Sequence, residues 1–515
     1  MKKNYLKRGT FALLILMLLG FNSQSFAQIR YVDVDPGVGT LNEAINGDTT
    51  ATGARVDTFN TVYRLKRVDE IYYISALISN IDYPLTVVAE EGDGPRPYLA
   101  LKADGTGSTA EYCFRPKGDL TVKGLHMTLM DDLGAMSSRV IRASADDIRI
   151  TIDNCWLDEA EVGIRLDDEN NKVYITNSVF SNLGDPSKPS AGRGIDDRGN
   201  SIDTLIIEDC TFYNITHSMI RDGGGYIKHC VINNNNFVNV GRRGFGFGNI
   251  AEIDFTNNIL HNVGFVPQDT GSSMAVFEMS PISQELLDLG YTQSINITNN
   301  SIFLDTTVFK DYLNDGTIAT PLFDPSGQAI VDANPVGDFY YENVNFENPP
   351  DEESIMKQVE YQLNENLNEE DTPDWILPDP PNSTFHLDVP FSFNYANSVA
   401  MTGSTDGTMI GDRNWTASPL SIEDAKAKQY SEAMSVYPLP AQTNVNVEFT
   451  LKSKSQVQIN VYNLSGKRVG TIINEMYPAG MHQVNWNFNN EINSGIYLLR
   501  MNADGKLSAS KMIVK

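Results

Sequence analysis

The sequence is poor in cysteine, tryptophan and histidine, of which its 515 residues include only 4, 4 and 6. Positive charge is also scarce, since 39 lysines and arginines stand against 66 aspartates and glutamates, for a formal net charge of −27. A chain this acidic repels nucleic acid and other polyanions at long range. After the N-terminal leader, no stretch is long and apolar enough to span a bilayer. We therefore expect no nucleic-acid partner and no transmembrane span.

Several catalytic signatures are missing as well. The sequence has no His-Glu-x-x-His zinc motif, no Walker loop and no Gly-x-Ser-x-Gly nucleophile turn. The glycine-rich run 244–248 lies between predicted strands and should not be interpreted as a nucleotide-binding loop. The acidic segment 342–379 has no spacing that defines a calcium site. We predict no resident cofactor, with calcium as the open alternative and the metal ligands unknown.

The most informative positive feature is an eight-residue pattern that occurs seven times. Positions one, three and eight are apolar, and position five is a small residue, usually asparagine. The copies start at Leu120, Ile150, Val173, Leu205, Cys230, Ile253 and Ile295. A period-two strand followed by a polar bend, repeated every 23 to 42 residues, is typical of a solenoid. We predict an all-β fold, a right-handed parallel β-helix in which the shortest intervals form one three-sided coil.

Position five is assigned a structural role. We expect its side chains to stack on one another as a ladder that satisfies the backbone of the bends. The members of this ladder are Asn154, Asn177, Asp209, Asn234, Asn257 and Asn299.

The four cysteines are expected to be buried thiols. Cys155 and Cys210 occupy the same repeat position two coils apart, which separates them by roughly 9.6 Å, too far for a disulfide. Cys113 and Cys230 complete the set.

The two ends of the chain indicate export. Residues 1–27 combine a basic start, a short apolar run and the small-x-small site Ser25-Phe26-Ala27, which predicts a signal peptide cleaved near Ala27. Residues 28–118 are predicted to form an N-terminal cap and the first coils, with a short helix at 40–45, and residues 119–415 the β-helix body. Residues 416–435 are predicted to be a linker. Short alternating segments in residues 436–515 predict a small C-terminal β-sandwich.

Four motifs in this C-terminal segment carry a resemblance to a known family. They are Tyr437-Pro438-Leu439-Pro440, residues 462–467 (YNLSGK), residues 494–497 (SGIY) and residues 511–515 (KMIVK). In this order they resemble the type A C-terminal sorting domain of the type IX (Por) secretion system. The resemblance implies that the type IX machinery is a partner and that the protein is secreted or held at the outer-membrane surface. We expect the mature protein to be a monomer.

A second strand in each coil carries the candidate functional residues. Its apolar residue is followed by an outward residue, so that Arg142, Arg165, Asp196, Arg221 and Glu278 should lie in one row. Asp167 and Arg198 follow on the same face, and neighbouring turns add Arg193, His217, Arg242 and Arg243. Three long loops leave from the turn before this row, and we expect them to wall a groove.

An arginine row in an acidic protein suits an extended anionic polymer, because guanidinium groups bind carboxylate or sulfate in a bidentate manner. Uronate-containing polysaccharide is the natural ligand. Eliminative cleavage of such a polymer needs a group that neutralises the carboxylate, a base and an acid. Arg198, Arg221, Arg243 and His217 are the candidates for the last two roles. The row can equally be a solvated salt-bridge ladder, and the sequence leaves both interpretations open.

The body resembles the pectate-lyase-like superfamily, and within it the chondroitinase B and alginate lyase type. The stretches that carry this similarity are 40–45, 85–92 and 402–415. These lyases pair a catalytic Lys and Arg about one coil apart, a spacing that Arg198, Arg221 and Arg243 match, but this chain has no Lys at the base position and no Glu-x-Glu before it. A non-catalytic adhesin or carbohydrate-binding scaffold is the alternative. A hydrolase that uses Asp196 and Asp197 has less support, because no other hydrolase motif accompanies the pair.

Overall fold

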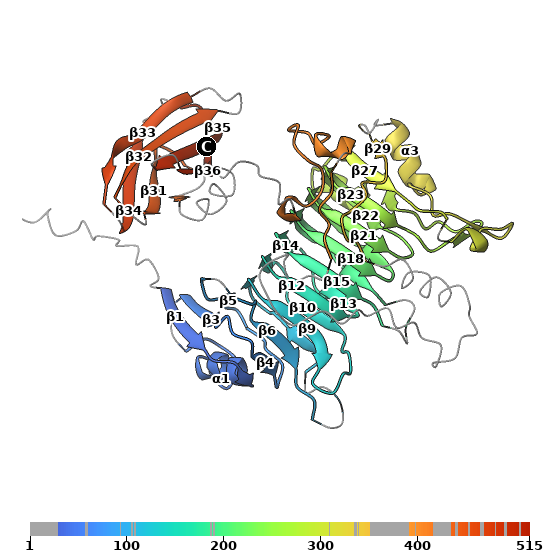
Figure 1. Ribbon diagram of the computed structural model, residues 1–515, viewed down its shortest axis with the longest axis horizontal. Helices are drawn as coiled ribbons and strands as arrows, with labels where there is room; N and C mark the ends of the chain where they lie inside the picture. Colours follow the sequence, from blue (N-terminus) through green and yellow to red (C-terminus); the bar gives the residue numbers. More distant parts are fainter. Residues whose placement is uncertain are drawn as a thin grey trace, which may run out of the picture. The chain divides into compact units, whose positions relative to one another are not determined.

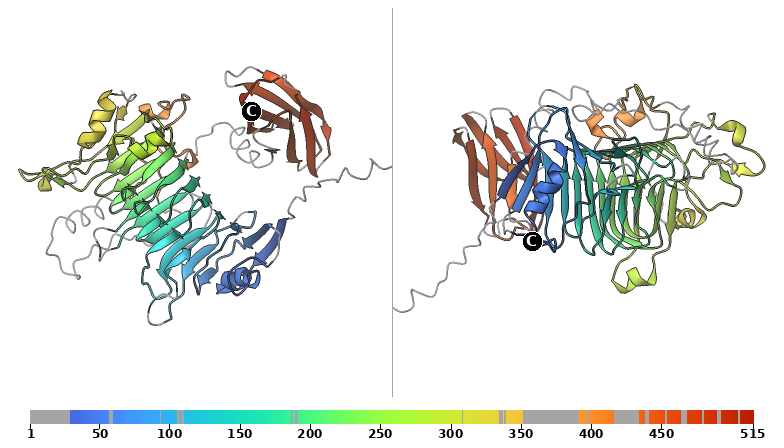
Figure 2. Two further views of the ribbon diagram at one scale, coloured as in Figure 1. Left: turned by 180° about the vertical axis from the view of Figure 1, so that it is seen from behind. Right: turned by 90° about the horizontal axis from the view of Figure 1, so that it is seen from below.

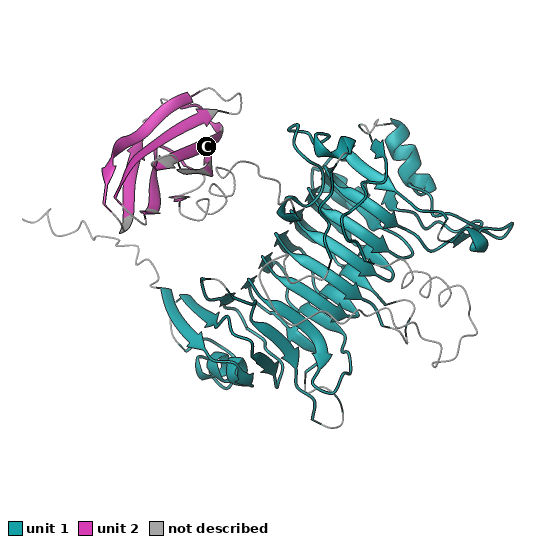
Figure 3. Cartoon of the chain, in the orientation of Figure 1, with its two compact units in different colours: residues 1–415 teal, residues 416–515 magenta. Residues whose placement is uncertain are grey.

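The computed structural model describes residues 29–350, 391–415 and 434–515, with short gaps at 57–59, 93, 105–106, 108–109, 186–187, 189–190, 308, 334–336, 338, 397, 438–440, 452–453, 464–467, 479, 489–491 and 504–505. The predicted signal peptide, most of the acidic segment 342–379 and most of the predicted linker lie outside the described residues. The chain divides into two compact units, residues 1–415 and 416–515 (Figure 3).

The first unit is a parallel β-helix, as the repeat predicts (Figures 1 and 2). Most coils contribute one strand to each of three faces. The face formed by the repeat pattern, here the repeat sheet, contains β1 (Ile29–Val34), β3 (Asn60–Leu65), β5 (Leu85–Ala89), β8 (Leu120–Lys123), β11 (Arg149–Asp153), β14 (Asn171–Thr176), β17 (Ile202–Glu208), β20 (Tyr226–Asn233), β22 (Phe245–Thr256) and β26 (Ser294–Thr298).

The second sheet follows the bend. It contains β2 (Gly37–Val38), β4 (Ile71–Ile74), β6 (Tyr98–Leu101), β9 (His126–Asp131), β12 (Trp156–Ala160), β15 (Val179–Leu183), β18 (Thr211–Ile215), β21 (Asn236–Val240), β23 (Ile259–Val263), β27 (Asn300–Phe303) and β29 (Phe339–Tyr341). The third sheet contains β7 (Tyr112–Phe114), β10 (Arg139–Ala143), β13 (Val162–Leu166), β16 (Arg193–Asp196), β19 (Ser218–Arg221) and β25 (Phe277–Ser280). The long strand β22 pairs with both β19 and β20, so it joins the third sheet to the repeat sheet.

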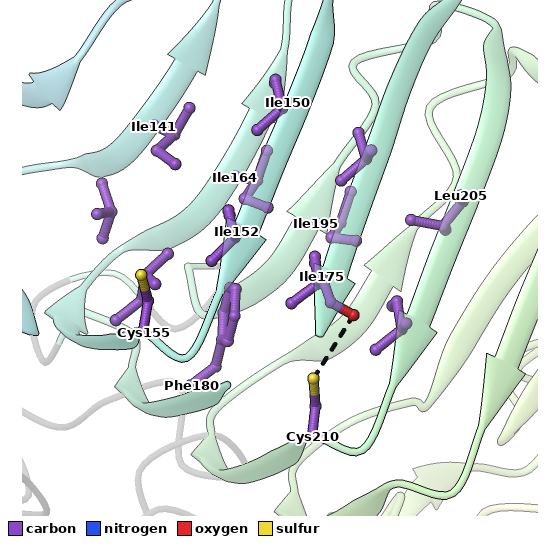
Figure 4. Packing of buried hydrophobic residues seen from close by; sticks show 14 of the residues in the cluster. Ile141, Ile150, Ile152, Cys155, Ile164, Ile175, Phe180, Ile195, Leu205 and Cys210 are labelled. Carbon is purple, nitrogen blue, oxygen red and sulfur yellow. Dashed lines mark hydrogen bonds between the residues drawn. The ribbon is translucent and has the colours of Figure 1, made fainter. Parts of the chain in front are cut away.

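The register of the repeat sheet confirms the sequence alignment of the seven copies. Leu120 pairs with Ile150, and the same line continues through Val173, Leu205, Cys230, Ile253 and Ile295. Positions one and three point inward and, except for Ile295, are at most 2% exposed in these copies. Figure 4 shows this interior, where isoleucines from neighbouring coils stack beside Phe180, Cys155 and Cys210. Stacking of identical apolar positions is what holds a solenoid together.

The asparagines at position five have a different role from the one that the sequence predicts, because the backbone conformation of the bend requires them. Its residues adopt the left-handed conformation, with φ between 50° and 71°, which asparagine, aspartate and glycine tolerate best. Their side chains do not form the expected ladder among themselves. Asn234 Nδ2 donates to the carbonyl oxygens of Met409 and Gly411, at 3.3 and 3.4 Å, and Asn299 Nδ2 donates to that of Gly403 at 2.7 Å. The expected ladder at this position is therefore wrong.

A hydrogen-bonded ladder lies one residue later, at position six. The backbone N–H of Asn235 donates to Asn258 Oδ1 at 3.0 Å, and that of Asn258 donates to Asn300 Oδ1 at 2.9 Å. Earlier coils have other residues at position six, and there the backbone N–H of Cys155 donates to Ser178 Oγ at 3.1 Å. A further column, five residues after the bend, links Asn182, Asn214, Asn239 and Asn262 through their side-chain amides.

The cysteines are free and buried, as expected from their positions. Burial raises the pKa of Cys113 and of Cys155 to about 12, and it raises the pKa of Cys210 and Cys230 as well. The neutral thiol is the stable form in this interior, and it is a poor nucleophile.

We therefore expect none of the four thiols to react with an aqueous thiol reagent in the native protein, and all four to react after denaturation. Counting labelled thiols by mass spectrometry, with and without urea, checks this. A thiol that is modified without denaturant would contradict the closed interior.

Helices and a C-terminal strap complete the first unit. The predicted cap is helix α1 (Thr40–Gly47), which buries Leu41 and Ile45 and contacts β1 and β4. The other elements are α2 (Gln284–Asp288), α3 (Pro325–Ala333), η1 (Lys310–Tyr312), η3 (Val399–Met401), η4 (Arg413–Trp415) and the pair β24 (Gln268–Asp269) and β28 (Thr317–Ile318). The strap, residues 403–415, follows the row of bends back across the coils, from Asn299 at one end to Asp209, which pairs with Arg413.

The second unit is a small β-sandwich of two antiparallel sheets. One contains β30 (Met434–Tyr437), β31 (Asn444–Leu451) and β34 (Gly480–Asn487), and the other contains β32 (Ser455–Asn463), β33 (Arg468–Tyr477), β35 (Gly495–Ala503) and β36 (Lys506–Val514). Val447, Val457 and Leu499 are buried in its core. The helices of the described residues are all too short or too polar to cross a membrane.

Candidate functional site

The predicted row of polar residues lies on the outward side of the third sheet. Strands β10, β13, β16 and β19 place Arg142, Arg165, Asp196 and Arg221 in register. The row continues to Gly246 of β22, which pairs with Glu278 of β25. The apolar neighbours of these residues, such as Ile164 and Ile195, fill the interior. Alternation along a strand therefore puts the charged members outside.

Arginines of this surface form three groups, each with a carboxylate. In the first arginine group, Asp167 accepts hydrogen bonds from Nε of Arg142 and from Nε of Arg165. Burial alone would raise the pKa of Asp167, but the two guanidinium groups hold it below its ordinary value. Arg142 also donates to the hydroxyl of Tyr112 and lies over its ring, 5.2 Å from the centroid. Two arginines thus share one carboxylate.

The second arginine group is centred on Asp196. Its Oδ2 lies 3.2 Å from Arg193 Nη1, and its Oδ1 lies 3.1 Å from Arg221 Nη1. The Asp196 side chain is 2% exposed, whereas that of Arg221 is 27% exposed. Burial lowers the pKa of Arg193 in spite of Asp196, and the charges of Arg221, Arg243 and other arginines add to this effect. The guanidinium groups of Arg193, Arg221 and Arg243 therefore lie close enough to repel one another.

The third arginine group contains Arg242, Arg243 and Glu278. Arg243 Nη1 lies 2.7 Å from Glu278 Oε2. Burial raises the pKa of Glu278, although Arg243 opposes the shift. Burial and Arg243 together lower the pKa of Arg242, against the opposing charge of Asp269. Within the described part of the chain, the buried Nε atoms of Arg242 and Arg243 have no hydrogen-bond partner.

His217 sits between the second and third groups, at the turn that leads into β19. Its carbonyl oxygen accepts the N–H groups of Arg242 and Arg243, each at 3.0 Å, which stacks the two turns. Burial, followed by the charges of Arg243, Arg193, Arg242 and Arg221, lowers the pKa of His217 to about 2. The imidazole is therefore neutral in this environment. It is 6% exposed, so contact with a polymer is restricted.

Asp196 and Asp197 have different surroundings. Asp197 Oδ1 accepts the backbone N–H groups of Gly199 and Gly223, at 3.0 and 2.7 Å. Burial raises the pKa of Asp197 to about 7, and the charges of Asp222 and Asp196 contribute. A carboxylate that joins its own turn to the turn of the next coil through backbone N–H groups has a structural role, which does not favour the hydrolase alternative.

Arg198 is an exposed residue of the turn after β16. It has a positive φ of 59°, and its backbone N–H donates to Asp196 Oδ1 at 3.3 Å. No hydrogen bond or ion pair of its side chain is found among the described residues. The structure therefore brings Arg193, Arg221, Arg242, Arg243 and His217 together, with Arg198 at their edge.

The sequence reasoning did not include Tyr112. It comes from β7, one coil before Arg139 with which it pairs in register. The signal was weak, because β7 precedes the first copy of the repeat pattern and its residues Tyr112, Cys113 and Phe114 show no alternation of apolar and polar side chains.

The three long connections lie where the sequence places them. They are 132–138, 184–192 and 264–276, and each leads from the second sheet to the third sheet. A cavity of about 150 Å³ lies elsewhere, in the last coils, where Leu260, Ile302 and Leu322 are among its apolar lining residues. The expected groove beside the arginine row stays a prediction.

Comparisons with known proteins bear mainly on the C-terminal unit. A crystal structure of an uncharacterized protein from Bacillus anthracis str. Ames is similar to part of the chain, with 16% identity over 14% of this chain and 70% of that chain, and a TM-score of 0.13. A similarity this low carries no argument. No curated protein matches the sequence. Residues 435–515 match the family described as the secretion system C-terminal sorting domain, so the C-terminal unit belongs to that family and the protein is exported by the type IX route.

Proposed function

We propose that this exported protein binds an acidic, uronate-containing polysaccharide along the outward side of the third sheet. The observation that carries the proposal is the composition of the three arginine groups. Two of them place two arginines around one carboxylate, and the third places Arg242 beside the Arg243–Glu278 pair, on a chain whose net charge is −27. Arginine suits this role because its guanidinium group binds carboxylate or sulfate in a bidentate manner.

Eliminative cleavage of the same polymer is a second candidate function. In this reaction a base removes the proton on the carbon next to the carboxylate, a double bond forms, and the leaving oxygen takes up a proton. The position of His217 among four arginines that can neutralise the substrate carboxylate supports this candidate, although an imidazole with a pKa of about 2 is a weak base. Its burial favours the binding role over the catalytic one.

One assay separates these functions. The purified chain is mixed with alginate, chondroitin, pectin and heparin-like polymers while binding and absorbance near 235 nm are recorded. Unsaturated products identify a lyase, and reducing ends without absorbance identify a hydrolase. Binding without product identifies a carbohydrate-binding scaffold. Failure of every acidic polymer to bind would overturn the proposal.

Replacing Arg221 by alanine should weaken polysaccharide binding about tenfold or more. The variant removes the more exposed guanidinium group of the Asp196 pair, and with it one charge-assisted contact to an anionic group of the polymer. The matched control is Arg64→Ala, which also removes one Arg–Asp pair, here with Asp33 on the repeat sheet. Affinity is measured by fluorescence anisotropy with a labelled oligosaccharide. An unchanged affinity for Arg221→Ala, or an equal loss for Arg64→Ala, would contradict the assignment of the third sheet.

A further inference from the structure

The interior of the β-helix contains a column of phenylalanines on the inner side of the second sheet. Phe180, Phe212 and Phe237 occupy the same position of β15, β18 and β21, and the centroids of their rings are 4.9 and 5.1 Å apart. The next two strands, β23 and β27, have Leu260 and Ile302 at this position. The aromatic column therefore stops where the side chains become smaller.

The cavity of about 150 Å³ lies in the coils where this column stops. Leu260 and Val276 line it and are buried, so they form its floor. Tyr341 of β29 pairs in register with Ile302 and also lines the cavity. Because Tyr341 is 73% exposed, the cavity reaches the surface beside it.

The lining of the cavity favours an apolar occupant. Its residues are all uncharged, and the polar residue among the buried ones is Thr320. The hydroxyl of Thr320 is already engaged, because it donates to the carbonyl oxygen of Val266 at 3.1 Å and accepts Nε2 of Gln268 at 3.2 Å. A buried water molecule needs roughly two to four polar partners, so water in this cavity is easily displaced.

We propose that the cavity binds a small neutral aromatic ring. An apolar cavity of about 150 Å³ in another protein binds benzene, so the volume is sufficient for one ring of that size. Phe303 and Tyr341 are the aromatic residues of the lining, and a bound ring can contact them while it buries its own apolar surface. This site is separate from the arginine groups and does not depend on the proposed polysaccharide binding.

Titration of the full chain with benzene tests the proposal. We expect saturable binding with a dissociation constant on the order of 1 mM, as suits a ligand of so few atoms. Pyrimidine has the same shape but carries polar ring nitrogens. It should bind about tenfold more weakly or worse, because its nitrogens lose their hydrogen bonds to water. Ligand-detected nuclear magnetic resonance measures both affinities.

Two variants locate the site. Ile302→Phe extends the aromatic column into the cavity and should weaken benzene binding about tenfold or more. The matched control is Ile206→Phe, the same substitution at a half-buried position of the repeat sheet, which should leave the affinity unchanged. Leu322→Ala enlarges the cavity and should bind the larger ring system naphthalene more tightly than the wild type does.

The gain expected of Leu322→Ala keeps the test decisive even if Ile302→Phe loses binding because it misfolds. The proposal is overturned if the wild type shows no saturable binding of benzene. It is also overturned if Ile302→Phe binds benzene as the wild type does, or if Leu322→Ala binds naphthalene no more tightly, because the ring would then bind elsewhere.

Discussion

Replacing Asn258 by alanine is expected to lower the free energy of unfolding of the β-helix by about 3–5 kcal/mol, since each buried polar group left without a partner costs about 1–3 kcal/mol. Asn258 is fully buried in the position-six ladder. Its Oδ1 accepts the backbone N–H and the Nδ2 of Asn235, at 3.0 and 2.9 Å. Its Nδ2 donates to the carbonyl oxygen of Ile232 and to Asn300 Oδ1, at 2.9 and 3.0 Å. Alanine removes these bonds and takes a partner from the buried backbone N–H of Asn235 and from the carbonyl oxygen of Ile232, whereas Asn300 Oδ1 keeps the backbone N–H of residue 258.

Urea denaturation monitored by circular dichroism measures this effect. Asn296→Ala is the matched control, because Asn296 is an exposed asparagine of β26 that donates to Asp254 Oδ1 at 2.8 Å. It should change the free energy of unfolding by less than about 0.5 kcal/mol, as surface substitutions do. Equal effects of the two variants would show that the ladder contributes no special stability.

The fold was predictable from the sequence because every coil must bury the same positions. The inward residues from Leu120 to Ile295 repeat with one spacing pattern, and this pattern alone determines the strand register. The asparagines were harder to interpret. At position five the residue is selected for a left-handed backbone, which a one-dimensional pattern cannot distinguish from a side-chain ladder. The ladder at Asn235, Asn258 and Asn300 begins with Cys155, so its residue type is not constant along the column.

The candidate site was predictable only in part. Alternation placed Arg142, Arg165 and Arg221 on the outward side, since the direction of a side chain follows from the strand. The pairing of arginines with carboxylates depends on side-chain conformations and on turns from different coils, which no local pattern contains. The strap shows the same limit, because Arg413 reaches an aspartate 204 residues earlier in the chain.

Asp197→Asn is expected to stabilise the β-helix at pH 8 by up to about 4 kcal/mol, because one pKa unit corresponds to about 1.4 kcal/mol. Burial raises the pKa of Asp197 from 3.8 to about 7. Between these values the folded chain holds a proton that the unfolded chain has released. Stability is therefore complete below about pH 4 and decreases as the pH rises through 7. Asparagine keeps the acceptor for Gly199 and Gly223 and has no charge to bury.

The wild type and the Asp197→Asn variant should therefore have similar free energies of unfolding at pH 4 and diverge as the pH rises. Part of the pH dependence should persist in the variant, because burial and the charge of Asp158 also raise the pKa of Glu159 to about 7. Asp254→Asn, at an exposed position of β22, is the control and should change the free energy of unfolding at pH 8 by less than about 0.5 kcal/mol, as surface substitutions do. Urea denaturation at pH 4, 6 and 8 in one salt gives the three profiles. A variant no more stable than the wild type at pH 8 would contradict this prediction. The N–H groups of Gly199 and Gly223 would then stabilise the ionised carboxylate enough to offset the cost of burying its charge.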